Sequence, residues 1–340
     1  MITFRRNQKR ITLYSVRCTE LNEMDEAIRV KDLRKYFRPR GRVLSSGTLI
    51  KAVDGVNISV PVAKIHSIVG ETGSGKSTIG RMIAGLIEPT SGEVYVHGID
   101  IFNSSKDQIR ELRKSVQIIF QDPYSSLNPR FNVKKIIEEP LKLNHIKFSS
   151  ERVLEILRKV GLTPPEDFLN RYPHELSGGQ RQRVSIARSF VTDPTFVVAD
   201  EPVSMLDASM RISFLDLIAE IQKEREISMM LISHDISIAY YLSSRINVLY
   251  LGKIVEEADG DEVVNNPLHP YTKALIQAVP KLGKVERKEV QIKGSIMTSS
   301  SEMVGCKFKD RCIYAMEKCK TQEPELIEAR PNHFVACHLY

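Results

Sequence analysis

The chain has 340 residues, of which 42% are hydrophobic and 27% are charged. Its length exceeds one average domain and its composition is that of a folded globular protein, which excludes a fibrous or wholly disordered chain. No apolar run approaches 18 residues and no signal-peptide pattern is present, so we expect no membrane-spanning segment. The net charge of +7 arises from 49 basic residues scattered among 42 acidic ones, which does not favour a nucleic-acid partner.

Residues 1–25 are predicted to be a flexible N-terminal extension. Its basic residues cluster near the start, and we interpret them as a solvated tail, with a lipid- or nucleic-acid-binding arm as the alternative. The segment Met24-Asp25-Glu26 directly precedes the first predicted strand, at residues 27–37, and translation from Met24 is the alternative to a flexible extension. A polar loop or exposed hairpin is predicted at residues 38–46, before the segment at residues 52–56. The basic cluster, within the first eleven residues of the extension, consists of Arg5, Arg6, Lys9 and Arg10.

The first motif with a clear chemistry lies at residues 70–78, where the chain reads Gly-Glu-Thr-Gly-Ser-Gly-Lys-Ser-Thr. An apolar run precedes it and a helical pattern follows it, which is the context of a phosphate-binding loop rather than of a chance Gly/Ser-rich turn. Glycines allow backbone N–H groups to converge on phosphate oxygens, Lys76 adds a charge, and the Ser77 hydroxyl can ligate Mg²⁺. The predicted nucleotide contacts are Gly70, Glu71, Thr72, Gly73, Ser74, Gly75, Lys76, Ser77 and Thr78.

Polar residues follow three further apolar runs that are typical of strands buried in a parallel sheet. Asp200 and Glu201 end one run, and we expect Asp200 to hold Mg²⁺ while Glu201 deprotonates the attacking water. His234 follows the next run and is expected to reach the γ-phosphate. Gln121 follows the third and has an amide suited to Mg²⁺ or to the lytic water. The alternatives are a surface acid pair and a structural histidine.

A second anion site is predicted at residues 176–180, which read Leu-Ser-Gly-Gly-Gln. Ser177 is a good N-cap for the helix that follows, and the free N–H groups of a helix start attract anions. Lys76 is already expected to bind the phosphate of this chain's nucleotide, so residues 176–180 have no phosphate to bind within the same chain. The predicted contacts are Ser177, Gly178, Gly179 and Gln180.

Together these motifs resemble the ATP-binding-cassette ATPases. The resemblance implies an α/β P-loop NTPase cassette over residues 26–265, with a RecA-like parallel sheet core, an antiparallel β subdomain and an inserted helical subdomain at about 121–190. It also implies that residues 176–180 cap the γ-phosphate held by the opposite subunit of a head-to-tail dimer. The family places an aromatic ring under the adenine, for which Phe37 fits best and Tyr36 second, with a plain strand aromatic as the alternative. Met205 stands in the dimer-contact loop where alanine is commoner.

Residues 120–129, 199–204, 269–275 and the chain end are similar to the oligopeptide/dipeptide permease ATPases, specifically the second of their two ATPase subunits. This resemblance implies a peripheral subunit on the cytoplasmic face of the cell membrane. It implies a second ATPase subunit, which we expect to be a different chain, two transmembrane permease subunits and an extracytoplasmic solute-binding protein. Peptides are the expected solute, with di- or oligosaccharides or nickel as alternatives. A nucleic-acid-acting ATPase is disfavoured because a second cassette and a coiled-coil insertion are both missing. A regulatory, non-hydrolysing subunit is disfavoured because the catalytic residues are present.

Four of the five cysteines lie in the predicted C-terminal extension at residues 266–340, and Cys18 lies apart. A reducing compartment disfavours disulfides, and the spacings lack the Cys-x-x-Cys pairs common in zinc sites. The family resemblance implies a 4Fe–4S cluster, with Zn²⁺ and free thiols as alternatives. We expect this extension to lie far from the phosphate loop, so that Cys312→Ser leaves ATP binding intact. The predicted ligands are Cys306, Cys312, Cys319 and Cys337.

Overall fold

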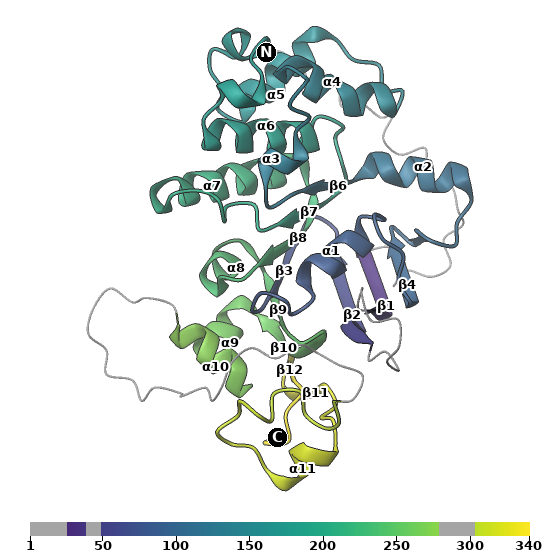
Figure 1. Ribbon diagram of the computed structural model, residues 1–340, viewed down its shortest axis with the longest axis vertical. Helices are drawn as coiled ribbons and strands as arrows, with labels where there is room; N and C mark the ends of the chain where they lie inside the picture. Colours follow the sequence, from purple (N-terminus) through teal and green to yellow (C-terminus); the bar gives the residue numbers. More distant parts are fainter. Residues whose placement is uncertain (1–25, 39–48, 279–302) are drawn as a thin grey trace, which may run out of the picture.

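A computed structural model describes residues 26–38, 49–278 and 303–340 of the chain (Figure 1). The predicted N-terminal extension, its basic cluster and Met24 lie outside the described residues. Most of the loop predicted at residues 38–46 also lies outside them. None of the helices in the described ranges combines the length and the apolar character that a bilayer crossing requires.

A large mixed sheet forms the centre of the molecule, with strands in the order β11-β12-β10-β9-β3-β8-β7-β6. Neighbouring strands from β9 to β6 pair in parallel, whereas β10, β12 and β11 pair antiparallel. The strands β3, β7 and β8 are buried along their whole length, which explains why most of their residues are apolar. The strands are β3 (Ile65–Val69), β6 (Val116–Ile119), β7 (Phe196–Asp200), β8 (Ser228–Ser233), β9 (Arg245–Tyr250), β10 (Lys253–Asp259), β11 (Ile327–Arg330) and β12 (His333–Val335).

A second, antiparallel sheet has the order β2-β1-β4-β5 and packs beside α1. The second half of β2 alternates between buried and more exposed residues, as expected for a strand with one face on a core. Its apolar face shares a buried cluster with α1 and the central sheet. This sheet agrees with the predicted antiparallel subdomain. Its strands are β1 (Glu26–Phe37), β2 (Ile50–Pro61), β4 (Ser91–Val96) and β5 (Ile99–Asp100).

Helices α3 to α6 gather at one end of the molecule, beyond β6 and β7 (Figure 1). Their apolar faces form one buried cluster with the adjoining side of the sheet, so the region predicted as helical is packed onto the core. The helices are α1 (Lys76–Ile83), α2 (Lys106–Ser115), α3 (Pro123–Ser126), α4 (Val133–Leu143), α5 (Ser150–Lys159), α6 (Gly178–Phe190), α7 (Ala208–Arg225), α8 (Ile236–Leu242), α9 (Gly260–Asn265), α10 (Pro270–Gln277) and α11 (Glu317–Thr321).

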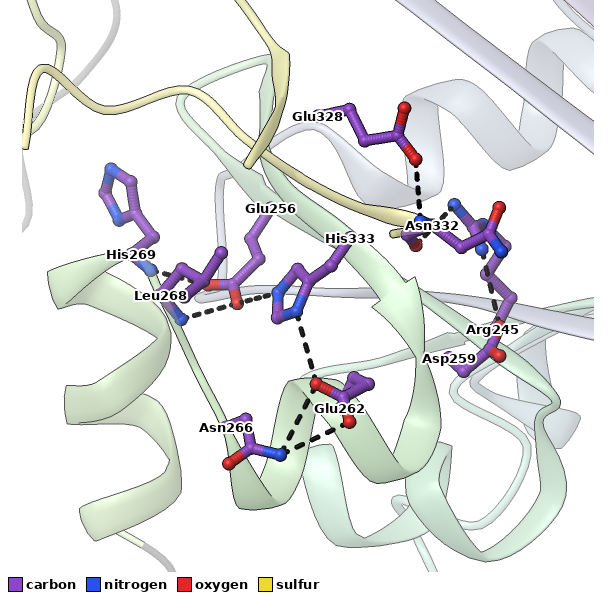
Figure 2. A network of polar contacts seen from close by, with 10 residues as sticks. All are labelled: Arg245, Glu256, Asp259, Glu262, Asn266, Leu268, His269, Glu328, Asn332 and His333. Atoms are coloured by element: carbon purple, nitrogen blue, oxygen red, sulfur yellow. Dashed lines mark hydrogen bonds and ion pairs between the residues drawn. The ribbon is translucent and has the colours of Figure 1, made fainter. Parts of the chain in front are cut away.

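The C-terminal segment, residues 303–340, joins the central sheet through β12, which pairs with β10. A buried carboxylate lies at this junction (Figure 2). Glu256 of β10 accepts hydrogen bonds from the backbone N–H groups of Leu268 (2.7 Å) and His269 (2.8 Å). It also contacts Nε2 of His333, in β12, at 2.7 Å. One buried carboxylate therefore connects β10, the start of α10 and the C-terminal segment.

Candidate active site

A cavity of about 420 Å³ opens at the carboxyl ends of β3, β7 and β8. Ligands of parallel α/β sheets bind at this edge, because loops that leave neighbouring strands converge there. Most of the predicted phosphate loop borders the cavity, together with the three predicted catalytic residues. The lining residues are Ala52, Thr72, Gly73, Gly75, Lys76, Ser77, Thr78, Gln121, Glu201, Ser204, Met205 and His234.

The phosphate loop depends on glycine for its shape. Gly75 has φ of 108°, and a Cβ atom there would lie 2.1 Å from the carbonyl oxygen of Ala52. Only glycine fits a position with both that conformation and that approach. The next residue, Lys76, is the first of α1, and its Nζ donates to the carbonyls of Gly70 (2.7 Å) and Glu71 (2.9 Å). Burial lowers the pKa of Lys76, whereas the nearby Glu201 and Asp200 carboxylates act in the opposite direction.

Ser77 and Asp200 are two of the three residues predicted to hold magnesium, and Gln121 is the third. The Ser77 hydroxyl donates to Oδ1 of Asp200 at 3.0 Å, joining the first turn of α1 to the end of β7. Burial raises the pKa of Asp200, and the hydrogen bond from Ser77 lowers it. A hydroxyl and a carboxylate beside a phosphate site are oxygen donors of the kind that Mg²⁺ prefers, so these residues fit the ion.

The three predicted catalytic side chains meet at one carboxylate oxygen. Oε2 of Glu201 accepts a hydrogen bond from Nε2 of Gln121 at 3.0 Å and lies 3.0 Å from Nδ1 of His234. The Glu201 side chain is 11% exposed and that of His234 is 53% exposed, so the carboxylate lies inside the cavity and the imidazole at its rim. Glu201 has φ of 47°, an uncommon conformation for this residue, and its N–H donates to the carbonyl of Ile232 in β8.

The predicted signature contacts and the predicted adenine contact do not border this cavity. Ser177 is the N-cap of α6, and its hydroxyl accepts from the N–H of Gln180 in a reciprocal capping box. Phe37 lies at the end of β1 with 41% of its surface exposed. Tyr36 donates its hydroxyl hydrogen to Oδ1 of Asp54 at 2.6 Å. Contacts of Phe37 and of residues 177–180 with nucleotide therefore stay predictions.

Glu71 does not line the cavity and is held by two residues from later in the chain. Its N–H donates to the Tyr271 hydroxyl at 2.8 Å, and Arg311 donates to both of its carboxylate oxygens, at 2.7 and 2.9 Å. Arg311 lies in the segment that we expected to be far from the phosphate loop, and that expectation is wrong. The physical reason is that β12 pairs with β10, which brings the segment back onto the cassette. The roles of Arg311 and Tyr271 were not predictable from the sequence, because no local pattern marks partners separated by 240 and 200 positions.

The four C-terminal cysteines lie close enough to affect one another, and none forms a disulfide. Burial raises the pKa of Cys306 to about 11, and burial also raises the pKa values of Cys312 and Cys337. The backbone N–H groups of Phe308, Tyr314, Met316 and Leu339 donate to the sulfurs. Within the described ranges, no three His, Cys, Asp or Glu side chains are arranged to hold a metal ion. The cluster therefore stays a prediction.

Comparisons with known proteins agree with the motifs. Residues 53–204 match the family described as ABC transporter, and residues 255–319 match the oligopeptide/dipeptide transporter C-terminal region. The chain is 44% identical to the oligopeptide transport ATP-binding protein AppF of Bacillus subtilis, covering 92% of this chain and 97% of AppF. It is 39% identical to the dipeptide transport ATP-binding protein DppF of Haemophilus influenzae, covering 94% of this chain and 98% of DppF.

A solved structure shows the same fold. This is the dimeric post-hydrolysis state of the ATP-binding cassette MJ0796 bound to ADP and Pi, with a TM-score of 0.61 and 30% identity, covering 68% of this chain and 98% of that one. The cassette fold and the ATPase family predicted from the sequence are thereby confirmed. The chain belongs to the ATP-binding subunits of ABC transporters, in the oligopeptide/dipeptide transport family.

Proposed function

We propose that this chain hydrolyses ATP to power peptide import through a binding-protein-dependent transporter. The observation that carries the proposal is the Glu201 carboxylate, held by Gln121 and His234 in the cavity that Lys76 and Ser77 also border. Relatives named for oligopeptide and dipeptide transport support peptides as the solute. Saccharides and nickel are the alternatives.

The residues of the cavity have different roles in ATP hydrolysis. The N–H groups of the phosphate loop and the Lys76 ammonium bind the β- and γ-phosphates. To do so, the ammonium exchanges its hydrogen bonds with the carbonyls of Gly70 and Glu71 for contacts with the phosphates. Ser77 and Asp200 would hold Mg²⁺, which would supply positive charge to neutralise the phosphate oxygens. Glu201 takes a proton from the attacking water, Gln121 orients that water, and His234 contacts the γ-phosphate.

The active unit that we propose is a head-to-tail pair of cassettes. Residues 177–180 form a helix start with N–H groups, but they do not border the cavity of their own chain. In a dimer, the N–H groups of this helix start would bind a phosphate of the nucleotide held by the partner subunit. The dimeric state of the MJ0796 cassette supports this arrangement. We infer that the partner is a different ATPase subunit, and that both attach to two permease subunits at the cytoplasmic face of the membrane, supplied by an extracytoplasmic binding protein.

We also propose that residues 26–265 form the nucleotide-binding domain and residues 266–340 a family-specific extension with a four-cysteine metal centre. The chemistry of the donor set supports the centre, because four neighbouring sulfurs each receive a backbone N–H, an interaction that stabilises thiolates. A 4Fe–4S cluster would require ligand side chains to close around it, and Zn²⁺ is the alternative. Anaerobically purified protein should contain roughly four irons and absorb near 400 nm; a colourless protein without iron contradicts the cluster.

The test of the function is Glu201→Gln in the assembled transporter. Loss of the general base should lower hydrolysis by about 10²- to 10⁴-fold while nucleotide binding is retained. Lys76→Ala should instead weaken binding itself, because it removes a buried charge partner of the phosphates. Normal hydrolysis in both variants, or purification with nucleic acid in place of membrane subunits, would contradict the proposal.

A further inference from the structure

The phosphate loop contains an acidic residue, Glu71, at a place where ATP would bring several negative charges. Arg311 compensates this charge through two parallel hydrogen bonds, from Nη1 to Oε2 (2.7 Å) and from Nη2 to Oε1 (2.9 Å). The two side chains are only 8% and 20% exposed, so water screens their interaction weakly. Two-pronged Arg–carboxylate pairs of this kind fix orientation as well as charge.

All three polar groups of Glu71 take part in fixing the loop. The carboxylate is held by Arg311, the N–H donates to Tyr271 Oη at 2.8 Å, and the carbonyl accepts from Lys76 Nζ at 2.9 Å. Glu71 thus lies directly between Arg311 of the C-terminal segment and the lysine that binds phosphate. A shift of Glu71 changes the position of one of the two carbonyls that hold Lys76.

Arg311 is itself held in place by aromatic side chains. Its guanidinium lies 5.7 Å from the ring centroid of Tyr250 and 5.8 Å from that of Phe308. Tyr250 also packs against Tyr271, with ring centroids 4.7 Å apart. The aromatic cluster therefore connects both partners of Glu71, and it belongs to the buried core around β9 and α10.

The turn at residues 306–312 of the C-terminal segment, which contains Arg311, has a second connection to the phosphate loop. Nζ of Lys307 donates to Oδ2 of Asp54 (3.1 Å) and to the carbonyl of Leu251 (2.9 Å). Gly252, the neighbour of Leu251, donates its N–H to the carbonyl of Ser74 at 2.8 Å. The turn at residues 306–312 thus contacts the phosphate loop directly at Glu71 and indirectly at Ser74.

We propose that Arg311 is a positioning residue for nucleotide binding: it neutralises Glu71 and fixes the phosphate loop from the C-terminal segment. This proposal rests on the proposed ATPase function of the same site. Arg311 does not border the cavity, so it acts through Glu71 and not on ATP itself. The C-terminal segment is consequently part of what sets nucleotide affinity.

The test compares ATP-analogue binding and hydrolysis by the full chain, with the hydrolysis measured in the assembled transporter. Arg311→Met keeps an unbranched side chain against the aromatic rings and removes the charge and both hydrogen bonds. We expect Kd and KM to rise about tenfold, within the usual range for coupled sites, with kcat changed by less than about twofold. Arg311→Lys, which keeps the charge but not the two-pronged geometry, should recover part of the affinity.

The matched control is Lys320→Met, which removes one positive charge from an exposed ion pair with Glu317 in the same segment and should leave Kd unchanged. Glu71→Gln changes the other partner of the same ion pair, so the proposal can still be tested if Arg311→Met does not fold. If the two residues act together, the Glu71→Gln/Arg311→Met double variant should bind no more weakly than the weaker single variant.

A folded Arg311→Met protein whose Kd stays within twofold of the unsubstituted protein would overturn the inference. So would additive losses in the double variant, or a kcat loss with Kd unchanged. Glu201→Gln and Lys76→Ala separate this outcome from failure of the proposed function. If those two variants lose hydrolysis and binding as expected while Arg311→Met binds normally, only the positioning role is wrong.

Discussion

Replacing His333 by leucine is expected to loosen the C-terminal segment from the central sheet. His333 and Glu256 are both fully buried, and Nε2 of the imidazole lies 2.7 Å from Oε1 of the carboxylate (Figure 2). Removing one member of a buried pair costs about 3–5 kcal/mol, because the other group stays buried without its partner. Glu256 retains two backbone N–H donors, so we expect a loss near the lower limit, about 3 kcal/mol.

The loss should be local, since β12 lies near the edge of the sheet and only β11 lies beyond it. Hydrogen exchange of the β12 amides measures it directly, and about 3 kcal/mol corresponds to exchange roughly a hundredfold faster. Glu328→Gln is the matched control, because its carboxylate accepts from the N–H of Asn332 in an exposed position of the same network. Equal exchange rates in the two variants would refute the reasoning. Adding Glu256→Gln to His333→Leu should recover part of the loss by removing the buried charge.

Three further predictions concern the site and its surroundings. Gly75→Ala should abolish nucleotide binding, measured by titration, because its Cβ would lie 2.1 Å from the Ala52 carbonyl oxygen. Ser177→Ala should lower the stability of the start of α6 by about 1 kcal/mol and reduce hydrolysis by the assembled dimer, with nucleotide binding by the single chain unchanged. Burial lowers the pKa of His269 from 6.5 to about 4, so the unfolded chain binds this proton first and stability falls as the pH drops from 6.5 towards 4. The loss between pH 7 and pH 5 should be about 2 kcal/mol, and His269→Asn, which can still cap α10, should reduce it in urea unfolding; an unchanged pH dependence would contradict this.

The cassette was predictable from the sequence because its chemistry is local. A buried parallel strand is a continuous apolar run, and the residue that follows it lies at the edge where ligands bind. Asp200 and Glu201 follow one such run and His234 another, so the order of motifs along the chain was enough to bring them together. The structure places the Glu201 carboxylate within hydrogen-bonding distance of Gln121 and His234, as this reasoning requires.

The position of the C-terminal segment was not predictable in this way. The strand β11 has only four residues and is largely exposed, so its alternation of apolar and polar residues is too short to reveal that it extends the central sheet. The pair of His333 with Glu256 joins residues 77 positions apart, and that of Arg311 with Glu71 joins residues 240 apart. Single charged residues at such separations have no signature, because any acid and any base in the sequence would fit equally well.

The phosphate loop tolerates an acidic residue because the fold supplies its counter-charge from elsewhere. An unpaired carboxylate at Glu71 would repel an incoming triphosphate and attract the Lys76 ammonium away from it. Arg311 neutralises the charge of Glu71, whose carbonyl accepts a hydrogen bond from Lys76. Binding of the phosphates by Lys76 would then exchange its contacts with two carbonyls for contacts with phosphate oxygens. The acid in the loop and the base in the C-terminal segment are consequently one functional unit, which explains why a segment outside the ATPase motifs belongs to the nucleotide site.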